Sequence, residues 1–267
     1  MRKLLTVWIA MVFVLSLSVV SSAQMTGDDV IQKYLENTGG MENYKNMESM
    51  KMEGKAFFGQ MSGDFVLAQE APNKHFMKWT SDQFEVEVAS DGEQIWSKYP
   101  MVPGYIFAEE EDLPKQLEGM MMNPYLDYKE RGARAELVSE EKVKGQDAYN
   151  VRYIQAAGDT INLYFSKANF NLLRQSSGEG DQLFEKFKEV DGFTMPYKMT
   201  SSQGGQRIMT IIRSIEINPD LADSLFVAPP DSLRAPQEVV DQLKAQQEAA
   251  QKAAEEEAES SDEGTKE

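Results

Sequence analysis

Hydrophobic residues recur with a helical period in residues 26–40, TGDDVIQKYLENTGG. Thr26 and Asp28 are both suitable N-caps, and a pair of glycines is a typical helix end. The apolar side chains that share one face are Val30, Ile31, Tyr34 and Leu35. This segment is therefore predicted to be an amphipathic helix, followed by a short second helical turn at residues 41–47.

From residue 49 onward the period changes from 3.6 to two. In residues 83–89, QFEVEVA, Phe84, Val86 and Val88 alternate with glutamates. Such alternation is typical of antiparallel strands that are buried on one face only. Further segments of this kind, separated by Gly-containing turns, are 49–58, 64–69, 74–79, 93–99, 133–140, 147–155, 160–166, 171–177, 183–190, 194–201 and 207–217. The sequence predicts a mainly β fold, an antiparallel meander of about eleven strands.

One segment, residues 108–128, interrupts the alternation. It begins with acidic residues, contains three consecutive methionines at 120–122, and reaches Pro124, which stops a helix. Its residues at helical spacing are Leu113, Leu117, Met120 and Met121. We expect one or two short helices inserted midway through the sheet.

The first 24 residues have the layout of a secretory signal peptide. Arg2 and Lys3 precede an apolar run from Leu4 to Val20, and small residues follow it. The alternative is an uncleaved membrane anchor, since the run approaches the length that spans a bilayer. We expect cleavage and export to the periplasm, and no lipid attachment, because the chain has no cysteine.

Composition narrows the classes of function. The absence of cysteine excludes disulfides and thiolate metal sites, and a net charge of −17 opposes binding to nucleic acid or anionic lipid surfaces. The last 31 residues, 237–267, carry ten acids and three bases with few apolar side chains. We therefore expect a folded domain at 25–233 and an acidic, partly helical or disordered tail at 234–267.

Evidence for catalysis is weak. The single histidine, His75, lies on a predicted strand, and none of the common nucleophile, phosphate-binding or zinc-binding motifs occurs. The acidic run 109–112 is better explained as a charged first helical turn than as a calcium site. We expect no enzyme activity, no catalytic residues, no metal and no cofactor; a periplasmic hydrolase remains a minor alternative.

The chain is rich in methionine, with 16 residues, all but Met1 and Met11 beyond the leader. Many lie on the same strand faces as Phe and Trp. Few helices are predicted to cover so broad an apolar face. Two interpretations follow: a fully packed core, or an incompletely covered apolar cavity.

Several stretches resemble LolA-type lipoprotein carriers. A Pro-Asn turn and a tryptophan precede an Asp-Gly hairpin, a second tryptophan and a Tyr-Pro pair. The matching residues are Pro72, Asn73, Trp79, Asp91, Gly92, Trp96, Tyr99 and Pro100, followed later by Asp191, Gly192, Pro196, Phe226, Pro229 and Pro230. The resemblance covers residues 26–232, and the order of the motifs carries it, since each motif alone is common.

This resemblance implies an open antiparallel β-barrel around a hydrophobic cavity, with helices as its lid. The lid would comprise Leu113, Leu117, Met120 and Met121. The apolar strand faces would line an acyl-binding cavity with Met50, Met52, Phe58, Phe65, Phe84, Val86, Val88, Trp96, Tyr153, Leu163, Phe165 and Met199. For residues 183–190 either face is compatible with the pattern, and Trp79 and Trp96 are alternatively part of the barrel wall.

The function implied by the resemblance is that of a periplasmic carrier for the acyl chains of lipoproteins or lipids, sorting them to the outer membrane. Its partners would be the cargo and transient, membrane-associated donor and acceptor proteins, with no nucleic acid, and we expect a monomer. LolA has an arginine before the Pro-Asn turn that helps to hold the lid closed; here that position is Ala71. The alternative is a lipid-sensing interaction module like RseB, with the acidic tail as its partner-binding element.

Overall fold

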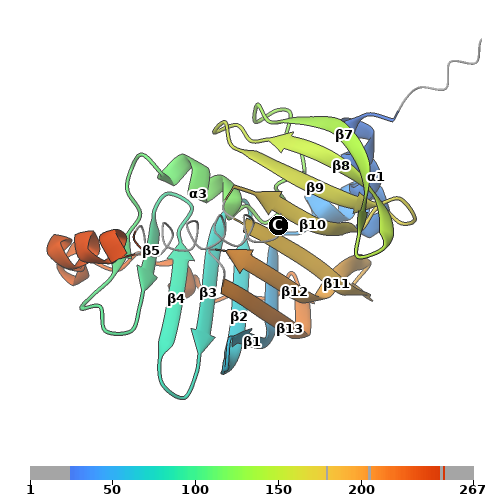
Figure 1. Ribbon diagram of the computed structural model, residues 1–267. Helices are drawn as coiled ribbons and strands as arrows, with labels where there is room; N and C mark the ends of the chain where they lie inside the picture. The colour runs from blue at the N-terminus through green and yellow to red at the C-terminus, as the bar shows by residue number, and fades with distance from the viewer. Residues whose placement is uncertain (1–24, 179, 204–205, 247–248, 250–267) are drawn as a thin grey trace, which may run out of the picture.

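The computed structural model describes residues 25–178, 180–203, 206–246 and 249 (Figure 1). The predicted signal peptide at 1–24 and the end of the acidic tail lie outside these residues. Within them the chain forms one antiparallel sheet of thirteen strands with a few short helices. The helices are α1 (Gly27–Thr38), α2 (Met41–Lys45), α3 (Leu113–Gly119), the 3₁₀ helices η1 (Asp223–Phe226) and η2 (Asp231–Leu233), and a helix at 237–246.

Strands that are consecutive in sequence are paired, and β1 closes against β13 to join the two halves. The order across the sheet is β6-β5-β4-β3-β2-β1-β13-β12-β11-β10-β9-β8-β7. The strands are β1 (Ser49–Phe58), β2 (Met61–Glu70), β3 (Lys74–Thr80), β4 (Glu85–Ser90), β5 (Ile95–Lys98), β6 (Ile106–Phe107), β7 (Arg134–Val143), β8 (Gln146–Ile154), β9 (Thr160–Ser166), β10 (Leu172–Ser177), β11 (Gly180–Val190), β12 (Phe193–Gln203) and β13 (Gln206–Ile217). Because the order ends on β6 and β7, the sheet is an open barrel.

The predicted mainly β fold and its open antiparallel barrel are confirmed. The strand count differs from the expected eleven partly because β6 has two residues, too few for alternation to reveal it. Residues 26–38 form the predicted helix, which begins with a capping box between Thr26 and Asp29. The hydrogen bond from the Thr26 hydroxyl lowers the pKa of the Asp29 carboxyl.

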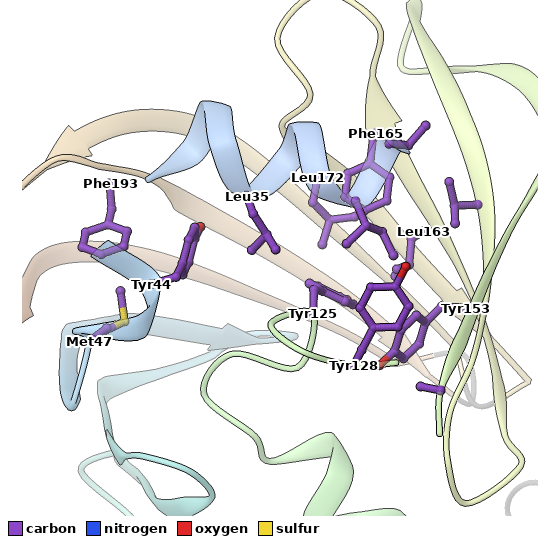
Figure 2. Close-up of a cluster of buried hydrophobic side chains, with 14 residues drawn as sticks. Leu35, Tyr44, Met47, Tyr125, Tyr128, Tyr153, Leu163, Phe165, Leu172 and Phe193 are labelled. Atoms are coloured by element: carbon purple, nitrogen blue, oxygen red, sulfur yellow. The ribbon is translucent and has the colours of Figure 1, made fainter. Parts of the chain in front are cut away.

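We call the face of the sheet on which α1 packs the inner face. There, α1, α2 and the segment 123–133 cover β7 to β10 and the start of β12 (Figure 2). Val30, Leu35 and Tyr44 from the helices meet Phe165 of β9 and Phe193 of β12, all less than 7% exposed. This cluster forms the core of one half of the barrel.

The outer face of the other half is covered by the chain that follows β13. Phe226 of η1, 4% exposed, packs in a cluster with Phe76, Ala89 and Trp96. Residues 221–228 therefore protect the outer face of β2 to β5, and β6 contributes Phe107 to the same layer.

Candidate functional site

An apolar row crosses five strands on the inner face. Met52 of β1 pairs with Leu67 of β2 and with Ile215 of β13. Leu67 in turn pairs with Met77, and Met77 pairs with Val88. Directly paired residues lie on the same face, so these side chains form one continuous strip. Leu67, Met77 and Val88 remain partly exposed to solvent.

A second, aromatic row lies nearer the β1–β2 and β3–β4 turns. Phe65 pairs with Trp79, which pairs with Val86, and the Trp79 ring meets Phe84 edge-on at 5.4 Å between centroids. The Trp79 indole N–H donates to the carbonyl oxygen of Ala56 at 3.3 Å, two strands away. Gly63 permits this approach, since a Cβ there would lie 2.6 Å from the indole nitrogen.

The predicted lining residues, Trp96 apart, share the inner face but belong to different environments. Met50, Met52, Phe65 and Met199 meet in one cluster on β1, β2, β12 and β13. Phe58, Phe84, Val86 and Val88 extend this surface toward the turns and β4. In contrast, Tyr153, Leu163 and Phe165, at most 2% exposed, lie beneath α1 and the 123–133 segment. These three residues form core rather than ligand-accessible surface in this conformation.

Trp96 does not line the inner face, and its predicted place is corrected. It pairs with Ala89, whereas the adjacent inner-face residue Val88 pairs with Ser97. Trp96 is 3% exposed and packs with Phe226 on the outer face. The alternation in residues 93–99 predicted a strand but not which of its faces is covered. The outer face is covered by residues 221–228, which are distant in sequence, and Trp96 is buried beneath them.

Leu67, Met77, Ile212 and Ile215 are inner-face residues that were absent from the predicted lining. Met77 lies between Phe76 and Lys78, and Leu67 lies between Val66 and Ala68, so alternation in these two strands does not single out one apolar face. Choosing between the two faces of each strand required the register with its neighbours.

The lid segment, residues 113–122, is attached at both sides of the inner face (Figure 1). On one side the Glu118 carboxylate accepts hydrogen bonds from the backbone N–H groups of Ala156 and Ala157, at 3.1 and 3.2 Å, in the β8–β9 turn. Lys115 forms an ion pair of 3.3 Å with Asp159 of the same turn.

On the other side the lid segment meets the β2–β3 hairpin. The Met122 N–H donates to the carbonyl oxygen of Pro72 at 3.2 Å. Met122 also packs against both inner-face clusters, the one beneath α1 and the one around Met50 and Met52. Ala71 is exposed at this hairpin, where the Gln69 side-chain amide also donates to the carbonyl oxygen of Met120 at 3.2 Å. Leu113, Leu117, Met120 and Met121, the predicted lid residues, are all partly buried.

The only histidine of the chain lies beside this attachment. His75 pairs with Gln69 on the inner face, with 3.4 Å between the Gln69 side-chain nitrogen and His75 Nδ1. Burial disfavours the imidazolium and lowers the pKa of His75 from 6.5 to about 4. A neutral imidazole therefore contacts the amide that holds the lid.

Two clefts open beside the lid segment. The larger, about 530 Å³, lies between α3 and the ends of β8 to β10, and includes Gln116, Gln155 and Thr160. The smaller, about 210 Å³, lies over β9 to β12, and both clefts share Ile161 and Ser177. Both border the inner face; the smaller cleft is lined mainly by amide and hydroxyl side chains, and the larger one adds Asp112, Lys115 and Asp159.

A further groove of about 570 Å³ lies at the β6 edge. It is bounded by Ile95, Phe107 and Leu113, and by Val240 of the 237–246 helix. Lys244 of that helix forms an ion pair with Glu109 at the start of the lid region. Residues 237–246 of the tail are thus helical and contact the domain.

Other site chemistry is limited within the described ranges. No three of His, Cys, Asp and Glu gather there as candidate metal ligands. No helix of the described ranges has the length and apolar character needed to cross a bilayer.

Comparison with known proteins rests on structure alone, because no family model and no curated protein matches the sequence. A LolA superfamily protein from Nitrosomonas europaea superposes with a TM-score of 0.50 and 11% identity, over 77% of this chain and 99% of that one. The fold is similar to that of this LolA superfamily protein. The resemblance predicted from the sequence motifs is thereby confirmed at the level of fold.

Two more neighbours support the LolA-like fold. A candidate outer membrane lipoprotein-sorting protein domain from Vibrio parahaemolyticus has a TM-score of 0.51 and 12% identity, covering 74% of this chain and 94% of that one. A DUF1329 family protein from Desulfovibrio piger has a TM-score of 0.53 and 13% identity, covering 78% and 99%. These likenesses each cover about three quarters of the chain.

Proposed function

We propose that this protein is an exported carrier that binds the acyl chains of lipoproteins or lipids on its apolar inner face. The supporting observation is the uneven covering of that face. Beneath α1 the side chains are fully buried, whereas on β2 to β4 Phe65, Leu67, Met77 and Val88 remain partly exposed in a continuous strip.

The chemistry of this strip suits a ligand that is taken up and released. Removing an acyl chain from a bilayer forfeits about 0.8 kcal/mol per CH₂, on the order of 10 kcal/mol for a whole chain. A soluble carrier offsets this cost with apolar contacts of its own. Met50, Met52, Met77 and Met199 are flexible and polarizable, so they adapt to a chain and close again after its release.

The neighbours favour lipoprotein cargo, since one is named for the LolA superfamily and another for lipoprotein sorting. In such a role the protein acts in the periplasm between membrane-associated donor and acceptor proteins. Native mass spectrometry of protein purified without detergent, followed by organic extraction, would identify the cargo.

The two tryptophans of the domain allow a direct test. Trp79 lies on the inner face, and Trp96 lies on the outer face. Two single-tryptophan proteins are compared, Trp96→Phe and Trp79→Phe, each with Trp8→Phe in the leader. A fatty acid brominated along its chain quenches fluorescence at contact distance, and we expect strong quenching only in the protein that retains Trp79.

The same fatty acid without bromine is the control for effects other than contact. Equal quenching of Trp79 and Trp96, or saturable binding that quenches neither, would contradict an inner-face site.

A second candidate function is an interaction module whose output is a protein contact. The observation that favours it is the docked 237–246 helix, with Glu238 and Asp241 exposed and Lys244 paired to Glu109. Deletion of residues 237–267 separates the two functions. A carrier retains acyl binding after the deletion, whereas a module that depends on the tail loses its protein partner.

A further inference from the structure

The inner face changes from apolar to polar along one paired row. Leu163 of β9 pairs with Gln175, which pairs with Gln182 of β11, which pairs with Ser201 of β12. Ser201 then pairs with Ile208, and the row returns to apolar side chains. Three polar residues on adjacent strands thus lie beside the apolar pair Phe184 and Met199 of the neighbouring row.

These polar side chains line a cleft rather than an isolated patch. Gln175, Gln182 and Ser201 border the cleft of about 210 Å³ over β9 to β12. This cleft shares Ile161 and Ser177 with the cleft of about 530 Å³ beneath α3. A ligand group has room here, directly beside the lid segment.

The polar cleft adjoins both apolar clusters. The Gln182 side-chain nitrogen lies 3.9 Å from the Met199 sulfur, which belongs to the cluster around Met52. Gln175 donates to the Tyr125 hydroxyl at 2.6 Å, at the boundary of the core beneath α1. A thioether is a weak acceptor, so a ligand hydroxyl or carbonyl is a better partner for Gln182 than Met199.

The charges around the two clefts disfavour an anion. Their lining includes Asp112, Asp159 and Asp181 but, as its one cation, Lys115, which is paired with Asp159 at 3.3 Å. Asp181 is held by Arg174, whose guanidinium nitrogens lie 2.8 to 3.2 Å from its carboxylate. A phosphate placed in these clefts meets net negative charge.

We propose that these two clefts hold the head group of the cargo, and that this head group is uncharged and carries hydroxyl or amide groups. The site rests on the proposed function, because the acyl chains would extend from Met199 onto the apolar strip. Gln182 and Ser201 are its specificity-determining residues, since they contact the head group and do not belong to the core beneath α1.

The test measures displacement of a fluorescent fatty acid from the full chain by three lipids with matched acyl chains. These are a digalactosyl diacylglycerol, a diacylated lipopeptide with an uncharged peptide, and phosphatidylglycerol. We expect the uncharged lipids to displace the probe at concentrations at least about tenfold lower than phosphatidylglycerol, and the stronger of the two identifies the source of the head group.

In the double variant Gln182→Leu/Ser201→Ala, the affinity for the uncharged lipids should fall about tenfold. This change corresponds to the loss of one or two hydrogen bonds. Binding of the fatty-acid probe should weaken less than binding of the uncharged lipids, because the probe lacks their hydroxyl or amide head group. Ser214→Ala is the matched control, because Ser214 pairs with Glu53 on the outer face.

Two results overturn the head-group site. One is equal displacement by the three lipids; the other is an equal loss of probe and lipid binding in the double variant. Failure of the wild-type protein to bind the probe at all is a different result, and it overturns the proposed function together with the site.

Discussion

The Gln69 side-chain amide donates a hydrogen bond of 3.2 Å to the carbonyl oxygen of Met120. Gln69 lies on the inner face of β2, and Met120 follows the last turn of α3. The bond therefore joins the lid to the sheet across a gap of 51 residues in sequence. A neutral hydrogen bond of this kind contributes only about 1 kcal/mol, so it would break readily in the opening that the proposed carrier function requires.

Fixing the lid to the β8–β9 turn should block ligand uptake. Lys115→Cys and Asp159→Cys replace an ion pair whose charged atoms are 3.3 Å apart, and the chain has no other cysteine. The two introduced thiols are joined by a short, cleavable cross-linker. We expect the linked protein to unfold at the same or a higher temperature, and to load an acyl probe more than tenfold more slowly. Cleavage of the linker should restore loading, and unchanged loading of the linked protein would refute opening at this turn.

Weakening the same attachment should have the opposite effect. Glu118→Ala removes two charge-assisted hydrogen bonds to the β8–β9 turn. We expect stopped-flow release of a bound probe to become several-fold faster, since the open lid is then easier to reach. Glu110→Ala, an exposed acid near the start of α3, serves as the control for lost charge. Equal release rates in the two variants would show that Glu118 does not hold the lid.

The half-buried His75 should make the domain less stable in acid. Its pKa falls from 6.5 unfolded to about 4 folded, so between these values the unfolded chain binds more protons. Its contribution is fully present above pH 6.5 and is lost as the pH falls toward 4, by on the order of 3 kcal/mol. Urea unfolding from pH 7 to pH 4 should show a smaller decline for His75→Gln than for the wild type. Parallel curves would contradict this account.

The outer-face cluster should be essential for stability. Phe226→Ala leaves a cavity beside Trp96 and Phe76, and we expect a loss of about 3–5 kcal/mol in the free energy of unfolding. Val227→Ala is the matched control, because Val227 is 65% exposed and its loss should change stability by less than about 0.5 kcal/mol. Similar denaturation midpoints for the two variants would mean that η1 is not part of the cooperative domain.

Much of the architecture could be predicted from local pattern. The alternation in residues 49–58 and 83–89 and the helical period in 26–38 correspond to β1, β4 and α1, because side chains repeat at two or 3.6 residues in these structures. The two-residue β6 could not be predicted, since its pairing with Trp96 and Ser97 depends on contacts rather than periodicity.

The candidate site was predicted only in part. Met50, Met52, Phe65 and Met199, predicted to line a cavity, lie in one hydrophobic cluster on the inner face, and their role in acyl binding stays a prediction. The lid residues were recognised from their spacing, but their attachments to Gln69, Pro72 and the β8–β9 turn were not, because these partners are remote in sequence.

The sequence by itself determined that the chain forms an antiparallel sheet of alternating strands, interrupted by a segment with one short helix followed by three methionines. Only the tertiary structure decided which face is inner. Trp79 and Trp96 lie on similar alternating strands, yet they point to opposite faces. The physical reason is that alternation defines two faces without distinguishing them, whereas strand register and the packing of α1 and Phe226 determine what covers each face.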